Sequence, residues 1–160
     1  MLEPVHGTHM RNAWDFYKPD LSSEYPQVDG PETLQTYLGS VDATYDVFRS
    51  KYAKLAPARQ LPVAKSETSS DPRTAFNLHL ADYAILHSPY AKLVQKGFAR
   101  MLYNDYVVDP KNPLFASIPE EYQRLERRDT IVNKDVEKAF TGLAKELITK
   151  RLEPSIETVR

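Results

Sequence analysis

The sequence predicts a helix-rich α/β protein of 160 residues. Two observations support this prediction. Three long stretches place apolar residues in steps of three and four, which is the spacing of one face of an α-helix. A short apolar run precedes the second stretch, and a run that is apolar on both faces is typical of a strand buried on both sides. A chain of this length can bury a single core.

The composition excludes several classes of protein and of site. With 21 basic and 22 acidic residues the formal net charge is −1, so the chain lacks the clustered basic excess of a nucleic-acid-binding protein. No stretch is apolar over the roughly 18 residues that a membrane span needs, and residues 1–10 show no secretory signal. The absence of cysteine excludes a disulfide, a thiolate metal site and a cysteine nucleophile within this chain. We therefore expect neither nucleic acid nor membrane among its partners.

Residues 1–30 are predicted to be irregular, because proline and glycine interrupt any regular pattern. The segment is nevertheless rich in large rings, at Trp14, Phe16, Tyr17 and Tyr25. Contiguous exposed rings are unfavourable, so these rings are expected to pack on something. Two interpretations stay open: a lid over the core, or a wall of a binding site.

The first helix is predicted over about residues 31–55. Apolar residues from Leu34 to Tyr52 form one face over several turns, and the helix is expected to stop before Pro57. Residues 56–75 contain proline, serine, threonine and charge without any period. They predict an exposed insertion.

The second helix, about 89–107, follows the apolar run. The run predicts a short buried strand at about 83–87 that ends at His87. Ser88 and Pro89 are typical of a helix start. In α/β proteins, ligands gather where a strand ends and a helix begins. His87 is therefore a candidate for acid–base work, since the imidazole pKa lies near neutrality, although a lone histidine is more often structural.

Lysine and arginine form a row on the second helix. Lys92, Lys96 and Arg100 are spaced four residues apart and so share one side. Such a row is usually a solvated face, but its first two members lie where an anionic ligand at the strand end could meet them. His6 and His9 lie three residues apart, but no further residue completes a metal-binding pattern, so no metal site is expected.

The last helix is predicted over about 134–152. An apolar stripe that includes Val136, Phe140 and Leu147 supports it, and Pro154 is expected to end it.

Three ordered motifs occur along the chain. The first is Gly-Thr-His-Met at 7–10, followed by Trp-Asp-Phe-Tyr-Lys-Pro-Asp at 14–20 and Ser-Glu-Tyr-Pro at 23–26. The second is His-Ser-Pro-Tyr at 87–90 with Lys-Leu-Val-Gln-Lys at 92–96. The third is Asp-Val-Glu-Lys-Ala-Phe at 135–140. In this order and over nearly the whole chain, they resemble the 3-hydroxy-3-methylglutaryl-CoA synthase family.

This resemblance implies a partial thiolase-like αβα layered fold and a condensing acyltransferase. The family joins acetyl-CoA to acetoacetyl-CoA in the mevalonate route to isoprenoids and sterols. A cysteine takes the acetyl group, a glutamate acts as general acid and base, and a histidine holds the acetoacetyl thioester. The resemblance implies acyl-CoA substrates with no further cofactor, and a homodimer in the full-length enzyme. It also implies a cytoplasmic location, although the family's mitochondrial form is not separated by this sequence.

The resemblance also assigns roles residue by residue. His87 matches the catalytic, thioester-holding histidine, and Lys92 and Lys96 match positions that contact CoA. Thr33 falls where the family often has a CoA-contacting serine. The remaining two positions, Asp15 and His9, resemble polar residues that line the active site.

The chain also departs from the family pattern. Trp14 replaces the usual tyrosine, and Ala91 replaces a common cysteine that is not the nucleophile. The family's nucleophilic cysteine and catalytic glutamate lie upstream of the Gly-Thr-His-Met segment. The resemblance therefore implies that residues 1–160 are a single partial domain, an internal portion of a synthase with negligible activity alone. The alternative is a non-catalytic module that binds acyl-CoA or a protein partner.

Overall fold

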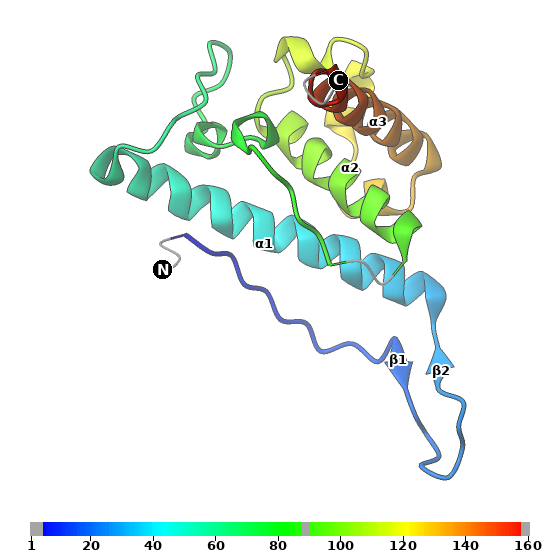
Figure 1. Ribbon diagram of the computed structural model, residues 1–160. Helices are drawn as coiled ribbons and strands as arrows, with labels where there is room; N and C mark the ends of the chain where they lie inside the picture. The colour runs from blue at the N-terminus through cyan, green and yellow to red at the C-terminus, as the bar shows by residue number, and fades with distance from the viewer. Residues whose placement is uncertain (1–4, 88–89, 158–160) are drawn as a thin grey trace.

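The computed structural model describes residues 5–87 and 90–157, and within these ranges three long helices dominate. They are α1 (Gly30–Arg59), α2 (Ala91–Val108) and α3 (Lys134–Glu157). Helix α2 packs against both of the others, as Figure 1 shows. The strands of the described residues are the antiparallel pair β1 (Phe16–Tyr17) and β2 (Gln27–Val28), in which Phe16 lies opposite Val28. None of the described helices is both long and apolar enough to cross a membrane.

Short 3₁₀ turns connect the long helices. They are η1 (Pro72–Ala75), η2 (Leu78–Leu80), η3 (Pro113–Phe115), η4 (Glu120–Arg124) and η5 (Asp129–Ile131). Residues 60–71, about half of which are exposed, lead from α1 to η1. There Arg73 pairs with Asp71 at 2.7 Å and with Asp46 on α1 at 3.3 Å, so the turn is held against α1.

Two helix ends differ from the prediction. Helix α1 continues past Pro57 to Arg59, and α3 continues past Pro154 to Glu157. Each proline lies in the last turn of its helix. Proline already has a helical φ angle, and in that turn it removes one hydrogen bond without interrupting any turn beyond it. The prolines therefore mark the last turns and do not stop the helices before them.

The predicted buried strand at 83–87 is wrong. These residues form neither strand nor helix, and Tyr83 and Ile85 are 88% and 96% exposed. A buried strand needs neighbouring strands to pair its backbone, and the described residues supply no strand beside this run. The apolar run instead crosses the surface between η2 and α2 (Figure 1). Helix α2 begins at Ala91, not at residue 89, and the predicted cap at residues 88–89 lies outside the described residues.

The N-terminal segment runs along α1 in the opposite direction (Figure 1). It approaches closely at Gly7, where an added Cβ would overlap the Thr44 carbonyl oxygen. The β1–β2 hairpin then extends beyond the N-terminal end of α1. Because Trp14 and Tyr25 are 73% and 80% exposed, the aromatic residues do not form a lid over the core of the described chain.

The apolar core lies where α2, α3 and η3 meet. Tyr106 of α2, Phe115 of η3 and Phe140 of α3 are buried, and their rings meet at centroid distances of 5.5–6.4 Å. Leu102 is fully buried beside them. Burying each such side chain contributes about 1.5–3 kcal/mol, so this cluster holds α3 on α2.

A polar layer joins α1 to α2. Arg100 of α2 donates to the carboxylate of Asp42 on α1 from Nε at 2.7 Å and from Nη2 at 2.6 Å. Its third nitrogen, Nη1, donates to the Thr130 hydroxyl at 2.8 Å. Asn104 also donates to Asp42, at 2.7 Å. All four residues are buried, so the two helices are joined by a charge pair that is removed from water and fully hydrogen-bonded.

A second arginine on α1 extends this layer. The fully buried Arg49 donates to Asp105 of α2 at 3.2 Å and to Asp46 at 2.6 Å, and Arg127 donates to the other oxygen of Asp46 at 2.5 Å. Burial raises the pKa of the Asp46 carboxyl, but hydrogen bonds from Arg127 and Arg49 outweigh burial and leave that pKa below its ordinary value. The Asp46 carboxylate therefore stays ionised between two arginines.

Replacing Asp42 with alanine is expected to lower the free energy of unfolding by about 3–5 kcal/mol, because it leaves the Arg100 guanidinium buried without its counter-ion. Equilibrium urea unfolding measures this loss. Glu32→Ala is the control: it removes an arginine–carboxylate pair with Arg11 that is largely exposed, and such pairs contribute about 0–1 kcal/mol. Equal losses for the two variants would contradict a dominant role of the buried pair.

Candidate functional site

The predicted CoA-contacting residues lie at one end of the α1–α2 pair. Tyr37 of α1 packs on Gly97 of α2, where an added Cβ would lie 3.0 Å from the Tyr37 hydroxyl. Thr33 lies one turn before Tyr37, and Lys92 and Lys96 lie in the first two turns of α2. Figure 1 shows the N-terminal ends of both helices on the same side of the molecule. Thr33 and the two lysines are therefore grouped at this end.

The three basic residues of α2 have different environments. Lys92 is exposed. The Lys96 ammonium is 3.0 Å from Oε2 of Glu137 on α3, with 21% of the lysine side chain exposed. Arg100 is buried against Asp42. The row is therefore not one solvated face: its first two members are accessible to a ligand, and the third belongs to the core.

His87 is exposed and lies four residues before the start of α2. It ends the irregular segment that follows η2, and that segment approaches the N-terminal end of α2 (Figure 1). The structure therefore places His87 and the two accessible lysines at the same end of α2. A histidine with a solvent-accessible ring at this position is available to hydrogen-bond a ligand.

Asp15 and Thr33 are linked through Asp29, the N-cap of α1. The Asp29 N–H donates to the Asp15 carbonyl at 2.8 Å, and the Thr33 hydroxyl donates to the Asp29 carbonyl at 2.8 Å. These bonds place Asp15 at the N-terminal end of α1. His9 is exposed and lies closer to Gly7, which contacts α1 at Thr44. His9 is therefore further along α1 than the other candidate residues.

A broad hollow of about 780 Å³ lies on the same end of the molecule. The hairpin and the start of α1 line it, with Trp14, Tyr17, Gln27 and Pro31 among its residues. Trp14 and Tyr17 meet edge to face at 6.4 Å, and the Tyr17 hydroxyl donates to Gln27 at 2.9 Å. This arrangement favours the interpretation of the aromatic segment as a wall of a binding site.

The sequence did not reveal an apolar pocket of about 390 Å³ beside the His87 segment. Its walls come from residues 78–86, from Val94 and Phe98 of α2, and from Leu147 and Ile148 of α3. Helical spacing in the sequence showed that the apolar residues of α2 and of α3 each share one face of their helix. It could not show that these faces lie opposite residues 83–86, because that run was expected to be buried in a sheet.

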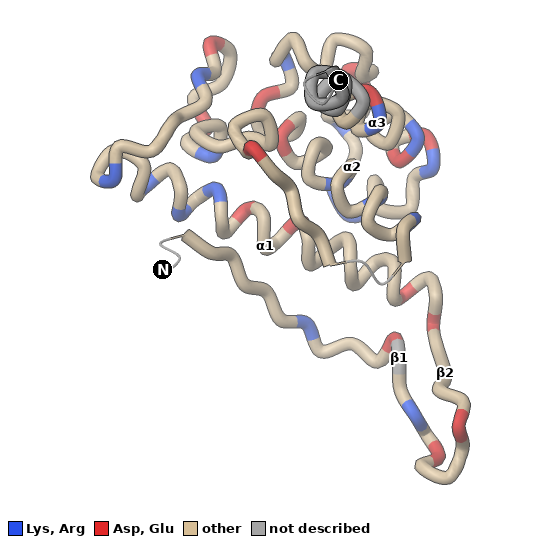
Figure 2. Tube along the Cα trace, viewed as in Figure 1, with Lys and Arg blue, Asp and Glu red and all other residues tan. Residues whose placement is uncertain are grey.

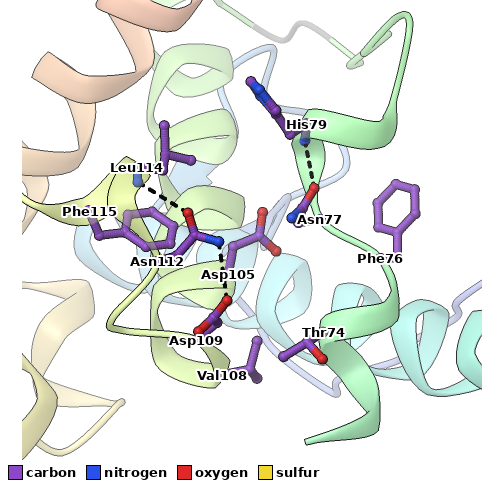
Figure 3. A pocket seen from close by; sticks show the side chains of 10 residues that line it. All are labelled: Thr74, Phe76, Asn77, His79, Asp105, Val108, Asp109, Asn112, Leu114 and Phe115. Atoms are coloured by element: carbon purple, nitrogen blue, oxygen red, sulfur yellow. Dashed lines mark hydrogen bonds between the residues drawn. The ribbon is translucent and has the colours of Figure 1, made fainter. Parts of the chain in front are cut away.

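A small cavity of about 20 Å³, room for roughly one water molecule, lies beside Asp105 (Figure 3). Asp105 is 4% exposed. Burial raises the pKa of its carboxyl from the ordinary value of 3.8 to about 6, against the opposing effects of the Leu78 N–H and of Arg49. The sequence signal for this group was the polar pair Asn104–Asp105 within an otherwise apolar part of the helix.

The described residues contain no group of three histidine, aspartate or glutamate side chains arranged to hold a metal ion. Each of the three long helices carries both basic and acidic residues, as Figure 2 shows.

The candidate site offers the His87 imidazole, the Lys92 and Lys96 ammonium groups, and nearby hydroxyl and carboxylate groups.

Comparison with known proteins identifies the family. Residues 1–160 match the family described as hydroxymethylglutaryl-coenzyme A synthase C terminal. The chain is 53% identical to a hydroxymethylglutaryl-CoA synthase of Mycosarcoma maydis, over all of this chain and 34% of that relative. It is 41% identical to one of Ganoderma lucidum, over all of this chain and 32% of that relative. With the cytoplasmic hydroxymethylglutaryl-CoA synthase of Mus musculus it shares 39% identity, over 95% of this chain and 28% of that relative.

The chain belongs to the hydroxymethylglutaryl-CoA synthase C-terminal family.

This membership confirms the resemblance drawn from the three motifs. It also confirms the predicted fold class, a helix-rich part of the thiolase-like α/β fold of hydroxymethylglutaryl-CoA synthases. Within that class, the strand assigned to 83–87 is wrong for the described chain, and the helix bounds differ as described above. The chain spans about a third of the length of the curated synthases it matches.

The buried Asp105 makes stability depend on pH. Its pKa is raised on folding, so the folded chain binds a proton between about pH 4 and pH 6 that the unfolded chain has released. The stabilisation from this group is present below about pH 4 and is lost as the pH rises through about 6. Relative to Asp105→Asn, which has no titrating group there, the natural chain is expected to lose about 3 kcal/mol of unfolding free energy between pH 4 and pH 7.

Urea unfolding of both proteins at several pH values measures this difference. Asp46, whose pKa is lowered, is common to both proteins and titrates below this window. A difference in unfolding free energy that does not change from pH 4 to pH 7 would contradict the raised pKa.

Gly7→Ala is expected to displace the segment that carries His9 and Asp15, because the new Cβ would overlap the Thr44 carbonyl. Hydrogen–deuterium exchange of residues 5–15 should become faster. The control is Gly39→Ala, since a Cβ at that position of α1 meets nothing within 4 Å and alanine favours the helix by about 1 kcal/mol. Unchanged exchange in Gly7→Ala would show that the segment does not rest on α1.

Proposed function

We propose that the chain supplies the histidine and lysine side of the active site of a hydroxymethylglutaryl-CoA synthase. The full protein is proposed to condense acetyl-CoA with acetoacetyl-CoA, as an acyltransferase of the mevalonate route. The observation that supports this most is the family match over residues 1–160. The grouping of His87, Lys92 and Lys96 at the N-terminal end of α2 agrees with it.

His87 is proposed to hold the acetoacetyl thioester. Its exposed imidazole is able to donate a hydrogen bond to a carbonyl oxygen of the substrate and so to stabilise negative charge that develops there during attack. The ring lies at the end of an irregular segment beside the 390 Å³ apolar pocket, whose lining includes Leu86, the residue before it.

Lys92 and Lys96 are proposed to bind the phosphate groups of CoA. An ammonium group is a compact charge that suits phosphate, and the two side chains are one turn apart on the same side of α2. Thr33 adds a hydroxyl at the same end of the molecule. Asp15 and His9 are proposed to line the site from the N-terminal segment.

The condensation needs groups that this chain does not contain. The resemblance assigns the acetyl-carrying nucleophile to a cysteine, and residues 1–160 have none. The carboxylate general base of the family also falls outside the motifs found in this chain. Covalent catalysis requires a nucleophile beside its base, so the 160 residues alone are expected to show negligible turnover.

The proposal needs no cofactor beyond the two acyl-CoA substrates. A homodimer of the full-length protein is proposed from the family resemblance. A cytoplasmic location is proposed because one relative, from Mus musculus, is named as the cytoplasmic synthase.

A second candidate is a non-catalytic module that binds acyl-CoA or a protein partner. The exposure of Tyr83 and Ile85 beside the apolar pocket favours it. Calorimetric titration of the full-length protein with acetoacetyl-CoA, together with an assay of its turnover, separates the candidates. Binding that Lys92→Ala weakens, without any turnover, would favour the module.

His87→Ala in the full-length protein is expected to lower kcat, because it removes the donor that stabilises the developing charge, and to raise KM for acetoacetyl-CoA by about tenfold, because it removes a hydrogen bond that holds the thioester. Lys92→Ala and Lys96→Ala should each raise KM by about twofold to fivefold, as expected for exposed ion pairs. Steady-state assay of CoA release measures these changes. Lys54→Ala is the control, because Lys54 is an exposed lysine near the other end of α1. An unchanged KM in His87→Ala would overturn the proposed role of the histidine.

A further inference from the structure

The Asp105 carboxylate connects three parts of the molecule. Its Oδ1 accepts the Tyr45 hydroxyl at 2.8 Å and Nη1 of Arg49 at 3.2 Å, both from α1. Its Oδ2 accepts the backbone N–H of Leu78 at 3.0 Å. Asp105 itself belongs to α2, so one buried side chain holds α1, α2 and the η2 turn together.

The η2 turn begins the stretch that leads to His87. Leu78 is buried, and Asn77 caps the turn by accepting the His79 N–H at 3.1 Å. Residues 81–87 then run without helix or strand as far as His87. A stretch without a regular hydrogen-bond pattern takes its course from its anchored ends and its side-chain packing. The anchor at Leu78 therefore sets where the chain leaves the η2 turn on its way to His87.

The far part of this stretch faces the same helix across the apolar pocket. Tyr83, Ala84 and Leu86 line one side of that pocket, and Val94 and Phe98 of α2 line the other. Because Tyr83 and Ile85 are 88% and 96% exposed, side-chain packing does little to fix the course of the stretch. Its direction therefore depends on the end that is anchored at Leu78.

We propose that Asp105 is a positioning residue for His87, which acts through the Leu78 N–H and so supports binding of the acetoacetyl thioester. This inference rests on the proposed function of His87. Asparagine is close to aspartate in size, but it turns one acceptor oxygen into an NH₂ donor. In Asp105→Asn, an NH₂ in place of Oδ1 would face two donors, Tyr45 and Arg49, whereas an NH₂ in place of Oδ2 faces only one. The second orientation is favoured, and it removes the acceptor of the Leu78 N–H.

Asp109 offers a matched control on the same helix. It is buried, it ends α2 one turn after Asp105, and it lines the same small cavity (Figure 3). Its carboxylate accepts the Thr68 hydroxyl at 2.6 Å and the Asn112 amide at 3.1 Å. These two bonds hold residue 68 and the turn that follows α2. Asp109→Asn makes the same chemical change but leaves the hydrogen bond from the Leu78 N–H to Asp105 in place.

The experiment compares Asp105→Asn and Asp109→Asn in the full-length protein. Three quantities are measured: KM for acetoacetyl-CoA, the rate of acetyl transfer from acetyl-CoA to the enzyme, and hydrogen–deuterium exchange of residues 76–87. Asp105→Asn is expected to raise KM for acetoacetyl-CoA by about tenfold, the effect of losing one hydrogen bond to a charged group. It should also speed exchange in 76–87 and leave acetyl transfer within about twofold of the natural rate. Asp109→Asn should change none of the three by more than about twofold.

Two results would overturn the inference. The first is an equal fall in acetyl transfer and in acetoacetyl-CoA binding, which is the mark of general loss of structure. The second is the same rise of KM in both variants. An unchanged KM in His87→Ala would instead overturn the proposed function, and faster exchange of 76–87 in Asp105→Asn would then show only that the carboxylate holds the turn.

A second variant keeps the test informative if Asp105→Asn does not fold. Leu78→Pro removes the other partner of the same hydrogen bond, at the first position of the η2 turn, where proline is tolerated. It is expected to raise KM for acetoacetyl-CoA as Asp105→Asn does, while acetyl transfer is retained. An unchanged KM in Leu78→Pro would overturn the inference.

Discussion

Asp42 of α1 and Arg100 of α2 meet through two hydrogen bonds of 2.6 and 2.7 Å inside the interface between the helices. A buried guanidinium tolerates little movement, because any shift leaves charge without a partner in a medium that cannot solvate it. The pair therefore fixes the register of α2 on α1. Through that register, the first turns of both helices reach the same end of the molecule, and with them Thr33, Lys92 and Lys96.

The chain separates its charged groups by role. Arg49, Arg100 and their carboxylate partners lie inside and hold the helices, whereas Lys92 and His87 lie outside and are available to a ligand. Lys96 is intermediate, since its ammonium is partly exposed and also paired with Glu137. A rigid ionic layer below an accessible basic end suits a site that binds an anionic ligand, because the scaffold does not reorganise when the ligand arrives.

The apolar surface beside His87 has a different origin. Tyr83 and Ile85 are almost fully exposed, and a 390 Å³ apolar pocket lies next to them. The run stays exposed because no strand of the described residues lies beside it to pair its backbone and cover its side chains.

The sequence alone was sufficient for the family and for the three long helices, because long ordered motifs and helical spacing are local in the chain. The candidate site residues stay predictions of the family resemblance. It did not place the ends of α1 and α3 correctly. Pro57 and Pro154 were expected to stop these helices, but each helix continues past its proline, because proline is compatible with a last turn. It also misplaced the run at 83–87, because an apolar pattern shows that a strand is possible but not whether a partner strand lies beside it.

The tertiary structure decided which basic residue of α2 is core and which are accessible: Lys92, Lys96 and Arg100 have identical spacing, and only the position of Asp42 on another helix buries the third. The role of Asp105 is likewise invisible in the sequence, because its partners Tyr45, Arg49 and Leu78 are brought to it only by folding.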